Sequence, residues 1–409
     1  MKSENFRRWV IKSIGIVLFS LAIILTIDLV TNAVTEFQGV SWDFTRYIDM
    51  AENGIRNNPN LVAPFAYRPL TPLLAGWLMR IFQFSSWKAF KLIAYSGAAL
   101  NLLTLYWLLD RMGYKFKNIL IVLEIISLQF FQIKFLMFDP FRPDHLVFAL
   151  INLAYLVLMA DLPFLLAAVV SLGLLVREFI VLPLAVYLAD FIKSKDSNFI
   201  KPLAVFAMAV SVFVGIRRFI PVQASEAYFE INSAGVFIKS LTNVLMDWKR
   251  NINILFCLSG YTLPILMVFT PTRWKSAWKE LGNYRLWMIV HAGFTLVLVM
   301  IGGTDVGRFI VYLYLPTAML LAAMLKNEKL RLLELLLVLT AVIIFNRIIW
   351  KVPTASVDAY RDFYGGYGSR INLQTDLRFF EIAGWIFICQ GYRRLITAKI
   401  PRKKMNPGK

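Results

Sequence analysis

A short stretch that follows the first apolar run of the chain carries an acidic side chain whose spacing suits chemistry at a membrane surface. Asp43 opens the stretch, and three further positions follow it at helical spacing: Tyr47, Ala51 and Gly54. These four positions would share one face of a short helix. A carboxylate beside a bilayer is partly desolvated and can act as a general base toward a hydroxyl. An ordinary solvated loop helix has the same pattern, so the spacing alone leaves both interpretations open.

Arg68 stands where the chain enters its next apolar run, directly after Tyr67. Pro69 and Pro72 disfavour a helix before this point and permit one to begin at Leu70. One interpretation of Arg68 is an interfacial anchor whose charged end reaches water. The other is a clamp for a phosphate group or another part of a substrate, because a guanidinium group can bind phosphate through two parallel hydrogen bonds.

A tight turn marked by two prolines carries charges of both signs, on Asp139, Arg142 and Asp144. Such a turn ends one element and begins the next. Its charged side chains fit a polar pocket on the same side of the membrane as Asp43. The alternative for Asp144 is a structural one, in which its side chain caps the helix that follows.

Two more charged turns interrupt the apolar runs. Arg177 and Glu178 are adjacent, so they either contribute to a pocket or neutralise each other in a buried bend. Asp305 and Arg308 belong to a glycine-rich turn, where the backbone can approach a ligand closely. Arg308 either grips a phosphate or pairs with Asp305 in a plain hairpin. The tyrosine, glycine and arginine residues around 360–370 suit sugar recognition or an interfacial aromatic belt.

The composition indicates the class of protein to which these charged turns belong. Of 409 residues, 58% are hydrophobic and only 17% are charged, against about 25% charged in soluble domains. The net charge of +19 comes from basic residues in short loops between apolar runs, which is typical of an oriented membrane protein and not of a nucleic-acid-binding one. Two cysteines and two histidines predict neither a disulfide framework nor a histidine-rich metal site. We expect His291 to be a hydrogen-bonded core residue.

We therefore expect an all-α fold: residues 1–409 form a single transmembrane domain of about 11 to 13 helices with short outer amphipathic helices. The candidate spans begin near Ile14, Trp87, Asn118, His145, Glu178, Ile200, Ile252, Tyr284, Phe309, Leu332 and Leu377. Runs 69–84 and 163–176 are marginal in length, and either 69–84 or 118–138 must fail to cross if the loops are to alternate consistently. Basic loops place both termini in the cytoplasm, and segments 35–68, 221–250 and 351–376 on the outer side.

The first outer loop resembles that of the GT-C-type membrane glycosyltransferases, most closely the mannosyltransferase-like branch that uses polyprenyl-phosphate sugars. The resemblance rests on Asp43-x3-Tyr47-x3-Ala51-x2-Gly54, followed by Tyr67-x-Pro69-Leu70. It implies a catalytic aspartate in this loop, which Asp43 matches, and an acid in a second outer loop, which Asp144 or Asp139 would match. It also implies inversion at the anomeric carbon. Many members of the family have a pair of acids at this position, whereas Asp43 is followed by Phe44. A divalent metal is therefore possible but not implied, and the sequence itself requires no cofactor.

These observations predict a glycosyltransferase of a bacterial or archaeal plasma membrane that moves a sugar from a lipid-linked donor to a glycan, lipid or protein acceptor. Asp43 is the expected catalytic residue. The expected substrate-binding residues are Tyr47, Tyr67, Arg68, Asp139, Arg142, Asp144, Arg177, Glu178, Asp305 and Arg308. The alternative is a transporter or lipid flippase, favoured by Glu124 and Lys134 inside an apolar run. A non-catalytic assembly partner is a third interpretation. No motif of an ATPase, a dinucleotide enzyme or a zinc protease is present.

Overall fold

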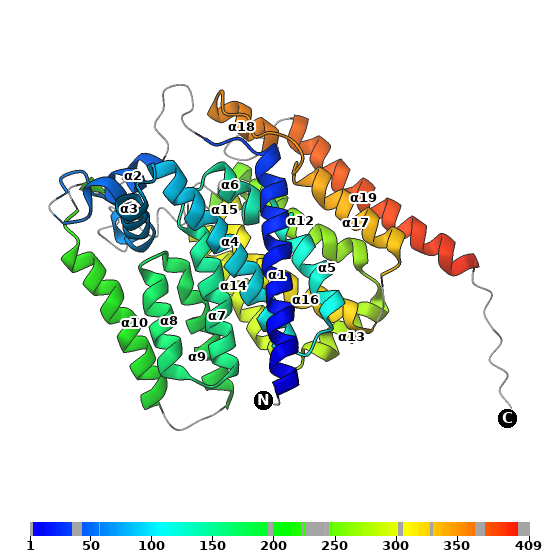
Figure 1. Cartoon of the computed structure of the whole chain (residues 1–409). Helices are drawn as coiled ribbons and strands as arrows, with labels where there is room; N and C mark the ends of the chain where they lie inside the picture. Colours follow the sequence, from blue (N-terminus) through cyan, green and yellow to red (C-terminus); the bar gives the residue numbers. More distant parts are fainter. Residues whose placement is uncertain are drawn as a thin grey trace.

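The computed structural model describes most of the chain, and helices make up the greater part of the described residues (Figure 1). The described residues are 3–34, 43–56, 58–194, 199–222, 224–225, 242, 245–246, 248–301, 306–327, 330–364 and 373–399. The prediction of an all-α helix bundle is therefore confirmed. Segment 221–250, in which an outer helix was expected, lies largely outside the described residues.

The longer helices are α1 (Ser3–Val30), α4 (Ser86–Arg111), α10 (Ile200–Phe219), α12 (Trp248–Val268), α14 (Tyr284–Ile301), α16 (Tyr314–Asn327) and α19 (Leu373–Lys399). The shorter ones are α2 (Phe44–Asn53), α3 (Leu70–Phe82), α5 (Phe116–Ser127), α6 (Phe135–Phe138), α7 (Asp144–Met159), α8 (Pro163–Leu174), α9 (Leu182–Ser194), α13 (Pro271–Leu281), α15 (Val306–Ile310), α17 (Leu332–Phe345) and α18 (Val357–Tyr364). Single turns are η1 (Phe65–Tyr67), η2 (Phe130–Lys134), η3 (Glu178–Val181) and η5 (Val311–Leu313), and two short strands, β1 (Val62–Ala63) and β2 (Ala224–Ser225), pair in parallel.

Several helices have the length and composition to cross a membrane. Among the described residues four qualify: Phe6–Val30, Ser86–Arg111, Ile200–Phe219 and Val306–Lys326. Two further pairs qualify only as broken spans, α5 with η2 and α6, bent by 69°, and α12 with α13, bent by 109°. The remaining apolar helices are shorter than a full crossing of about 20 residues.

The helix count and the span lengths thus differ from those expected. The described part holds more helices than the 11 to 13 expected for the bundle, because several apolar runs are broken into pieces. Short helices outside the apolar runs, such as α2 and α18, had been expected in addition. Neither of the two ambiguous runs, 69–84 and 118–138, forms one straight helix long enough to cross a membrane. The first forms only the 13-residue helix α3, while the second changes direction at Gln129, whose backbone is extended between α5 and η2.

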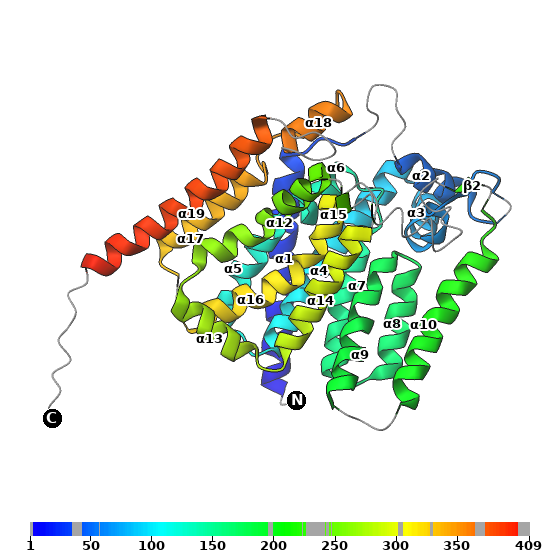
Figure 2. The same ribbon diagram turned by 180° about the vertical axis from the view of Figure 1, so that it is seen from behind.

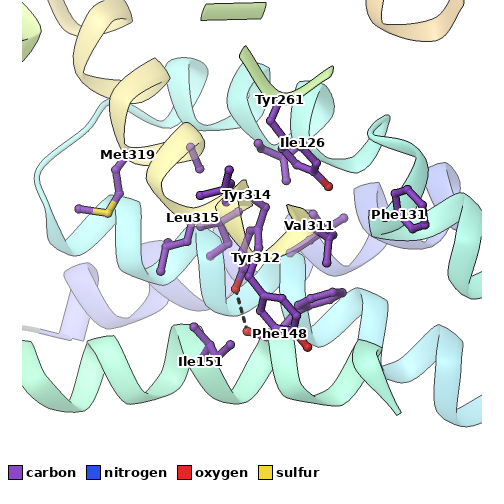
Figure 3. Close-up of a cluster of buried hydrophobic side chains, with 14 of the residues drawn as sticks. Ile126, Phe131, Phe148, Ile151, Tyr261, Val311, Tyr312, Tyr314, Leu315 and Met319 are labelled. Carbon is purple, nitrogen blue, oxygen red and sulfur yellow. Dashed lines mark hydrogen bonds between the residues drawn. The ribbon is translucent and has the colours of Figure 1, made fainter. Parts of the chain in front are cut away.

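The centre of the bundle is built on α4 and α7, which pack against each other along their length. Small residues on α4 allow this: a Cβ at Gly97 would lie 2.6 Å from the ring of His145 on α7. Aromatic side chains fill the space between α7 and the η5–α16 segment, where Tyr314 donates a hydrogen bond of 3.0 Å to the Phe148 carbonyl (Figure 3). The buried Asn152 and Asn101 amides are bonded to each other at 2.9 Å, which satisfies polar groups that would otherwise destabilise the core.

The two ends of the bundle carry different elements. Helices α2, α3, α6, α15 and α18 gather at the upper end in Figure 1, whereas the start of α1, helix α13, the end of α9 and the start of α10 lie at the opposite end. Figure 2 shows the same separation from behind. Turns that are far apart in sequence, including those at Asp43, Arg142 and Arg308, are thereby brought to one end.

Candidate functional site

Asp43 occupies the N-cap position of α2, but its side chain makes no capping hydrogen bond. Its Oδ2 instead lies 3.0 Å from Nη1 of Arg142. The Asp43 side chain is 39% exposed, whereas that of Arg142 is 4% exposed. The acid therefore stands at the surface with a buried guanidinium group behind it.

Helix α2 is fixed by close packing on α3. A Cβ at Gly76 of α3 would lie 2.4 Å from the carbonyl oxygen of Ala51, so only glycine permits this approach. Tyr47 on the same face of α2 is buried, with its ring edge-on to Phe65 at 5.7 Å between ring centroids. The predicted shared face of Tyr47 and Ala51 is thus the packed face of the helix, and it sets the position of Asp43.

The second charged turn lies directly beneath Asp43. Arg142 belongs to the turn between α6 and α7 and is hydrogen-bonded through Nε to Asp139, which is completely buried. Its guanidinium group also lies 5.5 Å from the ring centroid of Phe135. Arg142 therefore connects an exposed carboxylate to a buried one.

Asp144 lies at the centre of the charged turns. Its Oδ2 accepts hydrogen bonds from Nε and Nη2 of Arg308, at 3.0 and 2.8 Å, and its Oδ1 accepts from Arg177 and, at 3.2 Å, from Tyr312. The alternative in which Asp144 caps α7 is wrong, because the N-cap position is Pro143 and the Asp144 carboxylate binds two guanidinium groups. Two positive charges surround one buried negative charge.

The adjacent residues Arg177 and Glu178 do not neutralise each other as one interpretation expected. The extended backbone at Arg177 directs the two side chains to different partners. Arg177 binds Asp144, while Glu178 accepts a hydrogen bond of 3.1 Å from Nε of Arg68. Arg68 is buried and also lies 3.4 Å from the Tyr47 hydroxyl, so the interpretation of Arg68 as a snorkelling anchor is wrong.

Two residues of the site were missed from the sequence. Arg217, in the last turn of α10, stacks over the Tyr67 ring at 4.7 Å and lies 3.9 Å from the Glu178 carboxylate. Tyr312 binds Asp144 from one helical turn beyond Arg308. For Arg217 the sequence signal was an arginine pair at the end of an apolar run. For Tyr312 it was the spacing of four residues from Arg308, which places both on one helix face.

These groups form one charged cluster at one end of the bundle. We define the charged cluster as Asp43, Arg68, Asp139, Arg142, Asp144, Arg177, Glu178, Arg217 and Arg308. Asp144 is within electrostatic range of both Arg142 and Arg68, which joins the contacts described above into one group. Five guanidinium groups face four carboxylates, and the excess positive charge suits an anionic ligand.

Burial and pairing both act on these charges. Burial alone would favour neutral forms, but the Glu178 carboxylate raises the pKa of Arg68 above its ordinary value. In return, the Arg68 charge outweighs burial and lowers the pKa of Glu178. Burial and the neighbouring Arg308 charge lower the pKa of Arg177, whose buried Nε has no hydrogen-bond acceptor among the described residues. That Nε is a donor available to a ligand oxygen.

Other predicted residues lie elsewhere or outside the described part. Asp305 falls outside it, as do residues 365–372 of the last outer loop. Tyr360 is buried and stacks on Phe138 at 5.4 Å, so it belongs to the core. His291 is hydrogen-bonded to the Tyr155 hydroxyl at 2.7 Å and the Tyr312 carbonyl at 2.9 Å, which confirms its expected core role.

Lys134 has a structural explanation. Its Nζ donates hydrogen bonds to the carbonyl oxygens of Arg347, Ile348 and Trp350, just beyond the end of α17. The ammonium group thus satisfies carbonyls where the chain leaves a helix, and it is favoured there by the helix dipole. Glu124 on α5 is half-buried, and its side-chain carboxylate makes no hydrogen bond or ion pair to any described residue.

Metal ligands do not gather in the described part of the chain, where no three His, Cys, Asp or Glu residues form a set that could hold an ion. Comparison with protein-family models, curated proteins and solved structures finds no match for this chain.

Proposed function

We propose that this protein is an integral membrane glycosyltransferase of the GT-C type that uses a polyprenyl-phosphate-linked sugar as donor. The observation that carries the proposal is the charged cluster, in which an exposed carboxylate, Asp43, stands beside buried guanidinium groups at one end of a bundle of apolar helices. A base near an excess of positive charge is what transfer from a lipid phosphate needs.

In the proposed reaction Asp43 accepts the proton of the acceptor hydroxyl as its oxygen bonds to the anomeric carbon of the donor sugar. The bond between that carbon and the lipid phosphate oxygen breaks, and the phosphate leaves with the electron pair. Arg177 and Arg308 stabilise the departing phosphate, because guanidinium groups bind phosphate oxygens strongly in a desolvated site. Attack from the face opposite the leaving group inverts the anomeric carbon.

The exposure of the charges in the cluster also fits the proposed reaction. Asp43 is the most exposed of its ion-paired carboxylates, so an acceptor arriving from water reaches it first. The deeper acids hold the arginines in fixed positions, and fixed charges need no reorganisation during the reaction. The proposed site lies on the extracytoplasmic face, where the donor phosphate reaches it from the bilayer.

A transporter is the second candidate, and Glu124 is the observation that favours it. A carboxylate without a described partner inside an apolar helix is typical of an ion or substrate path. Lys134 had supported the same interpretation, but its ammonium group is hydrogen-bonded to the carbonyls beyond α17 and so has a structural role. The glycosyltransferase remains the better supported function, because the remaining charge pairs are concentrated at the ends of helices.

The test is sugar transfer by the purified protein in membranes supplied with labelled polyprenyl-phosphate sugars. We expect Asp43→Asn to lose transfer by about a thousandfold while Glu124→Gln retains it. Glu52→Gln is the matched control, because Glu52 is an exposed acid on the same helix α2. Full transfer by Asp43→Asn would remove the catalytic assignment, and loss only in Glu124→Gln, together with loss of substrate uptake, would favour the transporter.

A further inference from the structure

A second feature of the molecule lies at the end opposite the charged cluster. A cavity of about 760 Å³ opens between α7, α8, α9 and α10 and the turn that joins α13 to α14. We call it the α9–α14 cavity and define it by Asp190, Lys193, Lys201, Tyr187, Tyr284 and Trp287, which line it. Its volume falls within the range of about 300–1,000 Å³ that is typical of sites for small molecules and headgroups.

The interior of this cavity is acidic and aromatic. Trp287 is only 8% exposed and donates its indole N–H to the Oδ2 of Asp190. The rings of Tyr187 and Tyr284 line the same space, and Tyr284 lies edge-on to Trp287 at 5.3 Å. A carboxylate among aromatic rings is suited to an ammonium group, which pairs with the acid and lies over the rings.

The opening of the cavity has different chemistry. Lys193 at the end of α9 and Lys201 in the first turn of α10 are both exposed, so their ammonium groups can bind an anion without leaving water. The residues that precede them in the chain are exposed and apolar: Ile192 is 66% exposed and Ile200 is 76% exposed. The exposed Asp161 also lines the cavity, and Glu280, which lines it too, is paired with Lys326. From outside to inside, the order is therefore apolar surface, an opening with two exposed lysines, and an acidic and aromatic interior.

We propose that the α9–α14 cavity binds the headgroup of a zwitterionic membrane phospholipid with a primary ammonium group, namely phosphatidylethanolamine. Along that lipid the order is acyl chains, phosphate, ammonium, which matches the order of surfaces from outside to inside. The acyl chains lie on the apolar surface at Ile192 and Ile200, the phosphate binds Lys193 and Lys201, and the ammonium group donates to Asp190. A primary ammonium is preferred over choline because only it can donate hydrogen bonds to the carboxylate.

This proposal goes beyond sugar transfer and does not depend on it, since the cavity and the charged cluster share no residue. The test is native mass spectrometry of the whole purified protein after exposure to equal amounts of phosphatidylethanolamine, phosphatidylcholine and phosphatidylglycerol. We expect preferential retention of phosphatidylethanolamine, reduced about tenfold by Asp190→Asn and by Lys201→Gln. Asp110→Asn and Lys115→Gln, at the same end but outside the cavity, are the matched controls and should retain it.

Three results would overturn the proposal. One is equal retention of the three lipids, and another is unchanged retention in Lys201→Gln, whatever Asp190→Asn shows. Because Lys201 is exposed, Lys201→Gln folds even where Asp190→Asn fails, so the second result can always be read. The third is complete displacement of the bound lipid by soluble phosphoethanolamine, which would assign the cavity to a free zwitterion instead of a lipid.

Discussion

Nη1 of Arg142 lies 3.0 Å from Oδ2 of Asp43, and this contact joins an exposed acid to the buried interior of the bundle. Arg142 also binds Asp139, so one guanidinium group fixes two carboxylates on opposite sides. The position of Asp43 thus depends on a turn almost a hundred residues away. Changes in that turn should therefore affect the sugar transfer that we propose for Asp43.

Replacing Arg142 with lysine should weaken this connection. A lysine ammonium is a single charge on a flexible stem and cannot hold two carboxylates with the fixed geometry of a guanidinium plane. We expect kcat for sugar transfer to fall about ten- to a hundredfold, because a misplaced base loses most of its effect. Arg111→Lys, at an exposed position at the other end of the bundle, should leave kcat unchanged; an unchanged kcat in Arg142→Lys as well would show that Arg142 does not position Asp43.

Removing the charge of Asp144 should destabilise the protein strongly. In Asp144→Asn, Arg177 and Arg308 would be buried without the carboxylate that both of them bind. Breaking such a buried pair costs about 3–5 kcal/mol. The free energy of unfolding, measured by denaturant titration in micelles, should fall by this amount. In the control Asp110→Asn, at a half-buried acid at the opposite end of the bundle, it should fall by less than about 0.5 kcal/mol. Equal stabilities of the two variants would contradict the central place of Asp144.

The packing of α2 on α3 gives a matched pair of glycine substitutions. Gly76→Ala would place a Cβ 2.4 Å from the Ala51 carbonyl oxygen, whereas Gly293→Ala meets nothing within 4 Å. We expect the first to lower the free energy of unfolding by about 1–3 kcal/mol through overpacking. The second should leave it unchanged or raise it by up to about 1 kcal/mol, because alanine favours helices. The same titration measures both, and a stable Gly76→Ala would show that α2 is free to shift.

The pairing of Glu178 predicts a dependence of stability on pH. Arg68 lowers the pKa of Glu178 below its ordinary value of 4.5. A carboxyl group with a lowered pKa contributes stability that is present above its unfolded pKa and lost as the pH falls through its folded pKa. The wild-type protein should therefore lose more stability than Glu178→Gln when the pH is lowered from about 6 to about 3. Thermal unfolding midpoints at several pH values measure the difference; parallel curves for the two proteins would exclude this contribution.

Lys134 should be required for stability and dispensable for transfer. Lys134→Met removes the donor from the carbonyls of Arg347, Ile348 and Trp350, so one buried and two partly buried carbonyls lose a partner. We expect a loss of about 2–4 kcal/mol in the free energy of unfolding, with transfer per folded molecule retained. Lys115→Met is the control at an exposed lysine. Normal stability together with lost activity in Lys134→Met would show that Lys134 acts in the reaction and not in the fold.

Helix content was the part of the fold that the sequence predicted best. Each predicted apolar run contains a helix, because the hydrophobic pattern reports burial or lipid contact directly. The lengths were predicted less well. The bend at Gln129 and the reorientation at Thr270, which caps α13, depend on contacts with other helices that no local pattern reports.

Within the charged cluster, residue identity was predictable and pairing was not. Arg68, Asp144 and Arg177 stood out because charges beside apolar runs are rare. Their partners follow from the packing of distant helices: Glu178 binds Arg68 instead of its neighbour Arg177. Arg217 was not predicted as a site residue, because an arginine at the end of an apolar run also resembles a membrane anchor.

The contacts of Lys134 also constrain how the protein is made. The carbonyl of Ile348 that accepts its hydrogen bond lies 214 residues later in the chain. A ribosome that adds about 5–20 residues per second needs roughly 10–40 s to synthesise that interval. During this time the ammonium group is without its final acceptors, and in a chain that ends before residue 347 it would never find them.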